Sequence, residues 1–164
     1  MKKKKLLFIL QGGVGGAERV SVLIGKSLDR TKYEVVFCLI GRTDAKQPIE
    51  DFIPEGFRII KRKKAGGLLL IKSLYNVLKT EKPNIAFSSI MYINTKLLFI
   101  SKLFRNTKFI VRNNNYLYTL SVGQKAMVWA TYWMADKIVA QTDEMASEIV
   151  RELRVSPDKV KVLM

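Results

Sequence analysis

The sequence predicts a doubly wound α/β fold, with a parallel sheet of about seven strands and helices on both faces. Short apolar runs recur along the chain, and longer stretches with apolar residues at helical spacing lie between them. The first junction, residues 6–20, passes from an apolar run through four glycines into a helical pattern. Right-handed crossovers then place the carboxyl ends of all strands along one edge of the sheet. We expect ligands at that edge, near the first strand.

The expected elements follow this alternation. We expect strands at residues 6–10, 33–40, 57–60, 84–88, 108–111, 137–140 and 160–163. We expect helices from the glycine turn to about residue 28, and at residues 66–80, 91–104, 124–135 and 143–153. Residues 42–56 are expected to form a loop, with a helical turn near residues 49–53, and a polar loop over 112–116 follows the fifth strand.

Composition limits the chemistry of the chain. Its 164 residues predict one domain, and it has no apolar run of about 18 residues that would predict a membrane-spanning helix. The chain has no histidine and a single cysteine, Cys38, which predicts a buried thiol in a cytoplasmic protein without disulfides. The same lack of ligands argues against a metal site. We expect neither a metal nor another cofactor.

The net charge of +15 predicts an anionic partner, either a membrane surface or a nucleic acid. A basic run, Lys61, Arg62, Lys63 and Lys64, directly follows the third expected strand. Two interpretations of this run stay open, contact with the inner face of a membrane and simple solvation. The alternative function is a basic α/β nucleic-acid-binding module. It is not favoured, because the lysines are spread over several elements without a recognisable reader motif.

The glycine turn does not match the common nucleotide-binding motifs. In a G-x-G-x-x-G pattern begun at Gly13, the last glycine would fall on Glu18. In a Walker pattern ending at Gly25-Lys26-Ser27, the first glycine would fall on Val20. The sequence therefore argues against a nicotinamide site and a P-loop. Another Rossmann-like nucleotide binder that works alone stays open as a third interpretation.

The segment Gly-Gly-Ala-Glu-Arg-Val at residues 15–20 closely resembles the first glycine loop of retaining GT-B glycosyltransferases of the group 1, or family 4, type. Two weaker likenesses follow in the same order, at residues 82–86 and 135–144. The resemblance covers the whole chain and implies the N-terminal, acceptor-side half of such an enzyme. The C-terminal half, which holds the nucleotide-sugar donor with a glutamate pair, would be absent from these residues.

The resemblance implies transfer of a sugar from a nucleotide-sugar donor with retention of configuration, in cell-envelope polysaccharide or lipopolysaccharide synthesis at the inner membrane surface. It implies activity for the full-length protein and none for this part alone. The loop residues implied to face the donor diphosphate, chiefly through backbone N–H groups, are Gly13, Gly15, Gly16 and Arg19. Glu18 is interpreted as support for the start of the helix.

The same resemblance places a sugar or lipid-linked acceptor on this half. The residues expected to contact the acceptor are Ser89, Arg112, Asn113, Asn114 and Glu144. Many relatives have a histidine where this chain has residues 112–115, Arg-Asn-Asn-Asn, so no catalytic base is assigned. Arginine can hold a phosphate and asparagine can bind a sugar hydroxyl, although a hydrogen-bonded turn is an equal interpretation. The aromatic cluster Trp129, Tyr132 and Trp133, with Met134, is expected in the core or against the second half, and stacking on a sugar is the less favoured alternative.

Overall fold

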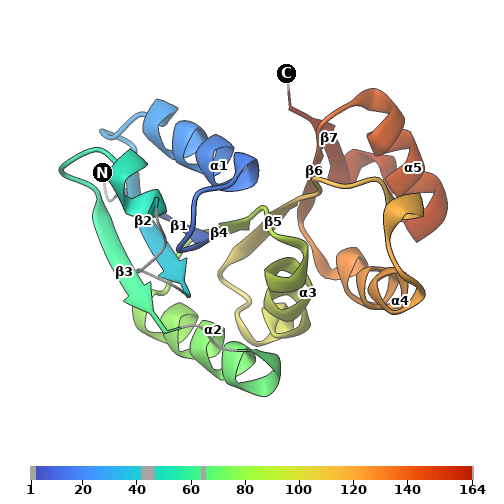
Figure 1. The fold of residues 1–164 in the computed structure, drawn as a ribbon, viewed down its shortest axis with the longest axis horizontal. Helices are drawn as coiled ribbons and strands as arrows, with labels where there is room; N and C mark the ends of the chain where they lie inside the picture. The colour runs from blue at the N-terminus through green and yellow to red at the C-terminus, as the bar shows by residue number, and fades with distance from the viewer. Residues whose placement is uncertain (1–2, 42–46, 64–65, 164) are drawn as a thin grey trace.

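A computed structural model describes residues 3–41, 47–63 and 66–163 of the chain, which leaves Lys64 of the basic run outside the described residues. It contains one seven-stranded sheet with the order β3-β2-β1-β4-β5-β6-β7, and all neighbouring strands run parallel (Figure 1). The expected fold class is confirmed. The strands are β1 (Lys4–Gln11), β2 (Tyr33–Ile40), β3 (Arg58–Arg62), β4 (Ile85–Ser88), β5 (Lys108–Arg112), β6 (Lys137–Ala140) and β7 (Val160–Val162).

Helices cover the two faces of this sheet unequally. The α-helices are α1 (Gly16–Ser27), α2 (Gly67–Glu81), α3 (Met91–Phe99), α4 (Val122–Thr131) and α5 (Asp143–Leu153). Side chains of α2, α3, α4 and α5 all join one buried cluster, whereas α1 and the short 3-10 helix η1 (Ile49–Phe52) join the other. Because β1 and β4 are neighbours and the chain runs outward from both, the switch point lies between their carboxyl ends.

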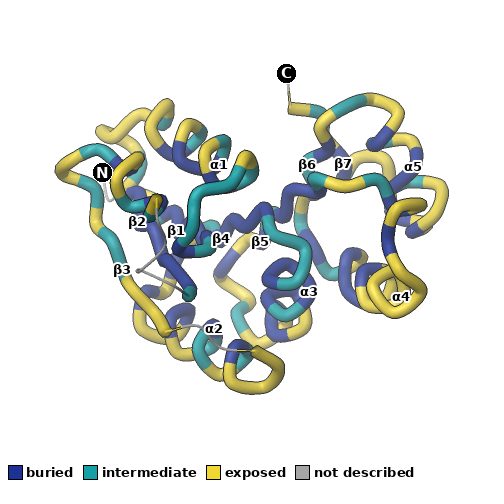
Figure 2. Tube along the Cα trace, viewed as in Figure 1, coloured by how far each residue is buried: buried dark blue, intermediate teal, exposed yellow. Residues whose placement is uncertain are grey.

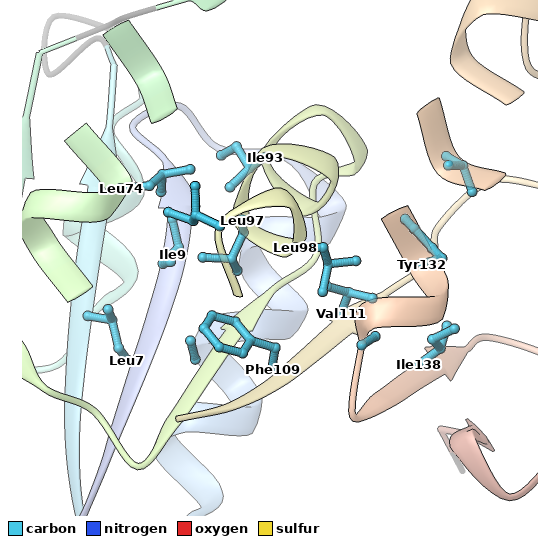
Figure 3. Close-up of a cluster of buried hydrophobic side chains, with 14 of the residues drawn as sticks. Leu7, Ile9, Leu74, Ile93, Leu97, Leu98, Phe109, Val111, Tyr132 and Ile138 are labelled. Carbon is cyan, nitrogen blue, oxygen red and sulfur yellow. The ribbon is translucent and has the colours of Figure 1, made fainter. Parts of the chain in front are cut away.

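The central strands are buried on both sides, as their continuous apolar runs predict for a parallel sheet. In β1, Leu7 and Ile9 face the cluster under α2 and α3, while Phe8 and Leu10 face α1. Figure 3 shows the first cluster, in which Leu97 of α3 lies close to Ile9. Figure 2 shows the central strands β1, β2, β4 and β5 as the buried centre of the molecule, β3 as a more exposed edge strand and α4 as a largely exposed helix.

Strand β3 is longer than expected at its carboxyl end. Lys61 and Arg62 belong to the strand, where they pair with Leu39 and Ile40 of β2. The basic run was expected to follow the strand, and that position is wrong for its first two residues. Charged side chains are common on an edge strand with exposed faces. The run of charges therefore did not indicate that Lys61 and Arg62 pair with β2.

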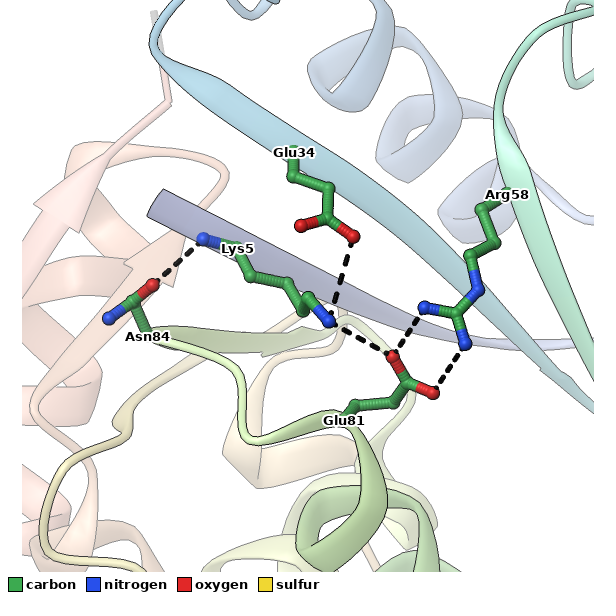
Figure 4. Close-up of polar contacts among 5 residues, drawn as sticks. All are labelled: Lys5, Glu34, Arg58, Glu81 and Asn84. Carbon is green, nitrogen blue, oxygen red and sulfur yellow. Dashed lines mark hydrogen bonds and ion pairs between the residues drawn. The ribbon is translucent and has the colours of Figure 1, made fainter. Parts of the chain in front are cut away.

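The opposite, amino edge of the sheet is tied together by a polar cluster (Figure 4). Glu81, at the end of α2, accepts two hydrogen bonds of 2.8 Å from the Arg58 guanidinium and one of 3.3 Å from Lys5 Nζ. Lys5 also lies 3.5 Å from Glu34, and its backbone N–H donates to Asn84 at 2.8 Å. These contacts join β1, β2, β3 and α2. The amino edge of the sheet therefore contributes to the stability of the fold.

Two further expectations can be compared with the described residues. Cys38 is a buried thiol, as expected, and burial raises its pKa to about 12. Of the aromatic cluster, only Tyr132 is buried, while Trp129 and Trp133 are exposed. The core interpretation is therefore wrong for both tryptophans. Within the described segments, no helix combines the length and apolarity that crossing a bilayer requires.

Candidate functional site

The glycine bend lies at the carboxyl end of β1, at the switch point, where the sequence placed it. The Gly12 N–H donates to the Ile40 carbonyl at 3.1 Å, and the Gly12 carbonyl accepts from the Ile49 N–H at 3.1 Å. The Val14 N–H donates to Gln47 at 3.3 Å, and Gly13 forms a bridge with Pro48. These bonds fix the bend against β2 and η1. The backbone then enters α1 at Gly16.

The first turn of α1 presents free backbone amides to a cleft. Gly15 is the N-cap residue and provides no side-chain cap, and Gly16 and Ala17 line the cleft. First-turn amides have no partner inside the helix, and no hydrogen bond in the described chain uses those of Gly16 and Ala17. A Cβ added at Gly16 would meet no atom within 4 Å. This turn therefore leaves room for an anion beside two unsatisfied donors.

Glu18 lies beside these amides and is the carboxylate that lines the cleft. Its side chain folds back over Gly15, where a carboxylate oxygen occupies the space that a Cβ would need. Glu18 is only 6% exposed, and burial raises the pKa of its carboxyl. Its contact with the first turn agrees with the expected role as support for the helix start.

The opposite wall of the cleft comes from the segments that follow β4 and β5. The cleft has a volume of about 460 Å³, and its lining includes Ser89, Tyr92, Asn113, Asn114, Asn115 and Gln124. Ser89 Oγ lies 2.7 Å from Ser21 Oγ and donates to the Ala17 carbonyl at 3.2 Å, so it joins β4 to α1. Asn114 donates from Nδ2 to the Ser89 carbonyl. The walls of the cleft are thus held to each other by hydrogen bonds.

A buried polar network supports the asparagine loop from below. The Asn94 amide of α3 donates to the Arg112 carbonyl at 3.0 Å and to the Tyr132 hydroxyl at 3.2 Å. The Tyr132 hydroxyl donates in turn to Asn113 Oδ1 at 3.3 Å, while Asn113 Nδ2 donates to the Asn115 carbonyl at 2.6 Å. Burial raises the pKa of Tyr132 to about 12, so this hydroxyl stays a donor. The network fixes the loop that faces α1.

Five of the expected site residues lie outside the lining of the cleft, namely Gly13, Gly15, Arg19, Arg112 and Glu144. Arg112 is 6% exposed, and its Nε and Nη1 atoms are buried without a hydrogen-bond partner in the described chain. Arg19 is exposed, and its guanidinium carbon lies 4.8 Å from the ring centre of Phe52. Glu144 is exposed in the first turn of α5, where hydrogen bonds with its own backbone and with Thr142 lower the pKa of its carboxyl.

The structure thus brings together Gly16, Ser89, Asn113 and Asn114 from the expected set. It adds Tyr92 and Gln124, which the sequence analysis missed. Tyr92 is the first-turn tyrosine of an apolar helix, and its hydroxyl accepts from Gln11 Nε2 at 3.0 Å. Gln124 completes a capping box with Ser121, a pattern that could have marked the start of α4. Within the described residues, no group of three or more metal-ligating side chains occurs.

Fold and cleft define a Rossmann-like domain with its ligand site at the switch point of the sheet. Residues 14–163 match the family model described as Glycosyltransferase Family 4, and the chain therefore belongs to that family. No curated protein gives a match.

Solved structures share the fold at low sequence identity. A glycosyltransferase from Rickettsia africae ESF-5 superposes with a TM-score of 0.72 at 16% identity, over 99% of this chain and 43% of that one. A UDP-N-acetylglucosamine 2-epimerase from Rickettsia bellii gives 0.71 at 11% identity, over 98% and 44%. The lipopolysaccharide outer core galactosyltransferase WaaB gives 0.65 at 16% identity, over 96% and 44%. The chain spans less than half the length of each.

Proposed function

We propose that this chain is the acceptor-binding half of a glycosyltransferase that takes its sugar from a nucleotide-sugar donor. The observation that carries the proposal is the cleft itself, where free amides of the first turn of α1 face the asparagine loop of residues 113–115. One wall suits the charged diphosphate of a donor, and the other suits the hydroxyls of a sugar. The chain spans less than half of each solved relative, which agrees with a donor site that a second half completes.

In this proposal the amides of Gly16 and Ala17 hold the diphosphate and stabilise the charge that it gains as the sugar leaves. An acceptor hydroxyl oxygen bonds to the anomeric carbon, while the bond from that carbon to the phosphate oxygen breaks. The hydroxyl proton passes to the leaving phosphate. Glu18 is the carboxylate in the described lining, and its side chain packs back over Gly15 in support of the helix start.

A pair of aspartate substitutions tests the diphosphate site. Gly16→Asp places a negative charge at the proposed site without a steric conflict, because a Cβ there meets nothing within 4 Å. An acidic residue in a first helical turn is also favourable for the helix. Gly123→Asp is the matched control, since Gly123 lies in the first turn of α4 in equally open space. The readout is binding of UDP to the chain by isothermal titration calorimetry.

We expect Gly16→Asp to weaken UDP binding at least tenfold, a loss of about 1.4 kcal/mol, while Gly123→Asp binds like the parent chain. Equal binding by all three proteins would reject a diphosphate at the α1 terminus. Equal thermal unfolding of both variants and the parent chain excludes a folding defect.

The acceptor is proposed to be a cell-envelope saccharide, or its lipid-linked precursor, met at an anionic membrane surface. The net charge of +15 and the basic strand end with Lys61, Arg62 and Lys63 support this location. A nucleic-acid partner is not favoured, since the family match points to sugar transfer.

A further inference from the structure

The exposed side of α2 and the end of β3 form a second polar pocket, separate from the cleft. The pocket has a volume of about 290 Å³ and is lined by Arg62, Leu69, Lys72, Ser73 and Asn76. Four of these five side chains are hydrogen-bond donors, and two carry a positive charge. Among the described residues, the lining contains no carboxylate.

The cations of this pocket are not neutralised by the described chain. Lys61 pairs with Glu50 at 2.7 Å, so this residue of the basic run is already engaged. Neither Arg62 nor Lys72 appears in an ion pair with any described residue. The acidic residue of α2 is Glu81, which is buried in its last turn. An anion that enters the pocket therefore meets only attraction from its walls.

An apolar edge adjoins the same pocket. Leu68 and Leu69, at the start of α2, are 82% and 69% exposed. Paired leucines beside a cationic pocket match a surface that lies in the headgroup region of a bilayer, with its apolar side chains at the acyl boundary. Binding of a soluble anion would not require exposed leucines beside the pocket. The leucine pair therefore favours a lipid over a free phosphate.

We propose that this pocket binds the phosphate of an anionic phospholipid, with Leu68 and Leu69 entering the bilayer beside it. The inference rests on the membrane location in the proposed function and assigns the contact to the pocket that α2 forms with Arg62, the second residue of the basic run. The Arg62 guanidinium can bind two phosphate oxygens, and Lys72, Ser73 and Asn76 supply further donors. The amino end of α2 follows the carboxyl end of β3, so the bilayer would lie along the edge that carries the cleft.

Vesicle sedimentation tests the assignment. The chain is mixed with vesicles of phosphatidylcholine alone, or of phosphatidylcholine with phosphatidylglycerol. The pocket variant is Arg62→Gln with Lys72→Gln, and its control is Lys26→Gln with Lys125→Gln, two exposed lysines on α1 and α4 with the same total charge. The apolar variant is Leu68→Ser with Leu69→Ser, and its control is Leu23→Ser with Leu103→Ser, which are also exposed.

We expect binding to the anionic vesicles only. Each basic residue at the surface contributes about fivefold in affinity, so the pocket variant should lose about 25-fold or more. The charge control should lose less, because its lysines lie outside the contact. The leucine variant should also weaken binding, while its control should not. Equal losses in the pocket variant and the charge control, or equal binding to neutral vesicles, would overturn the proposal.

Soluble glycerol 3-phosphate separates the two sources of phosphate. Binding of this compound by the parent chain, without vesicle binding, would assign the pocket to a free phosphate and overturn the lipid proposal. The UDP titration gives an independent readout for the cleft. A parent chain that binds UDP but does not bind anionic vesicles rejects this inference alone, and a parent chain that binds the vesicles but not UDP rejects the diphosphate site alone.

Discussion

At the scale of single residues, Glu18 and Arg112 are buried near the cleft, and neither forms an ion pair with another described residue. Glu18 contacts the first turn of α1, and Arg112 lies beneath the asparagine loop. Burial raises the pKa of Glu18 and lowers that of Arg112, which means that both charged forms are disfavoured. Each group therefore makes a prediction about stability that is independent of any substrate.

Glu18 should make the stability of the chain depend on pH. Its pKa in the folded chain lies above the ordinary value of 4.5, so its contribution is fully present below that value and is lost as pH rises through the raised pKa. In Glu18→Gln this loss is absent. The free energy of unfolding of Glu18→Gln, relative to the parent chain, should therefore increase between about pH 4 and pH 7. Urea unfolding at several pH values measures it, and parallel profiles would contradict it.

Arg112 should be replaceable by an apolar side chain of similar length. Its Nε and Nη1 atoms are buried without partners in the described residues, so the charge costs desolvation with no compensating contact. Arg112→Met should raise the free energy of unfolding by about 1 kcal/mol or more. Arg151→Met, at an exposed site where the guanidinium pairs with Glu152, should change the free energy of unfolding by less than about 0.5 kcal/mol. A loss of several kcal/mol in Arg112→Met would reveal a partner for the guanidinium.

At the scale of elements, the sequence predicted the strands better than the ends of the helices. Strand β2 was predicted at its observed limits, because a continuous apolar run stops sharply at Gly41. The helix expected at 91–104 ends at Phe99, since apolar side chains continue through a separate 3-10 turn, η2 (Ser101–Leu103). Helix α4 begins two residues earlier than expected, at Val122, because the capping box with Ser121 was overlooked.

The candidate site also has one part that the sequence predicts and another part that it does not. Its glycine bend is a local feature, fixed by residues adjacent in sequence, and could be predicted from Gly15 and Gly16. The contributions of Tyr92 and Gln124 depend on how two helix starts approach α1 in space, which no local pattern encodes. Arg112 was expected at the site from its position at a strand end. The alternation of side chains along β5 instead separates it from the cleft that Asn113 lines.

The packing of α1 on β2 makes a prediction about two glycines. A Cβ at Gly25 would lie 2.6 Å from the buried ring of Phe37, which also packs against Phe8 and Phe57. Gly25→Ala should therefore lower the free energy of unfolding by about 1–2 kcal/mol, despite the better helix propensity of alanine. Gly123→Ala, in open space on α4, should raise it by about 0.5 kcal/mol. Chemical denaturation of both variants measures the contrast, and equal signs would contradict it.

At the scale of the whole molecule, the two edges of the sheet serve different purposes. The amino edge is closed by the contacts of Glu81 with Arg58 and Lys5. The carboxyl edge leaves backbone amides of α1 free in a cleft lined by the asparagine loop, and it adjoins the cationic pocket of Arg62 and Lys72. We infer that a nucleotide-sugar donor, an acceptor and a membrane surface all approach this second edge, and that the amides of Gly16 and Ala17 are the point of contact for the donor.

The most direct test of that claim is a titration of the ¹⁵N-labelled chain with inorganic pyrophosphate, followed by the backbone amide resonances. Pyrophosphate carries the charged group of the donor without its sugar or base, so it reports on the diphosphate contact alone. The account predicts that the resonances of Gly16 and Ala17 shift and saturate together. Shifts confined to the basic residues of β3 and α2, with Gly16 and Ala17 unmoved, would contradict it.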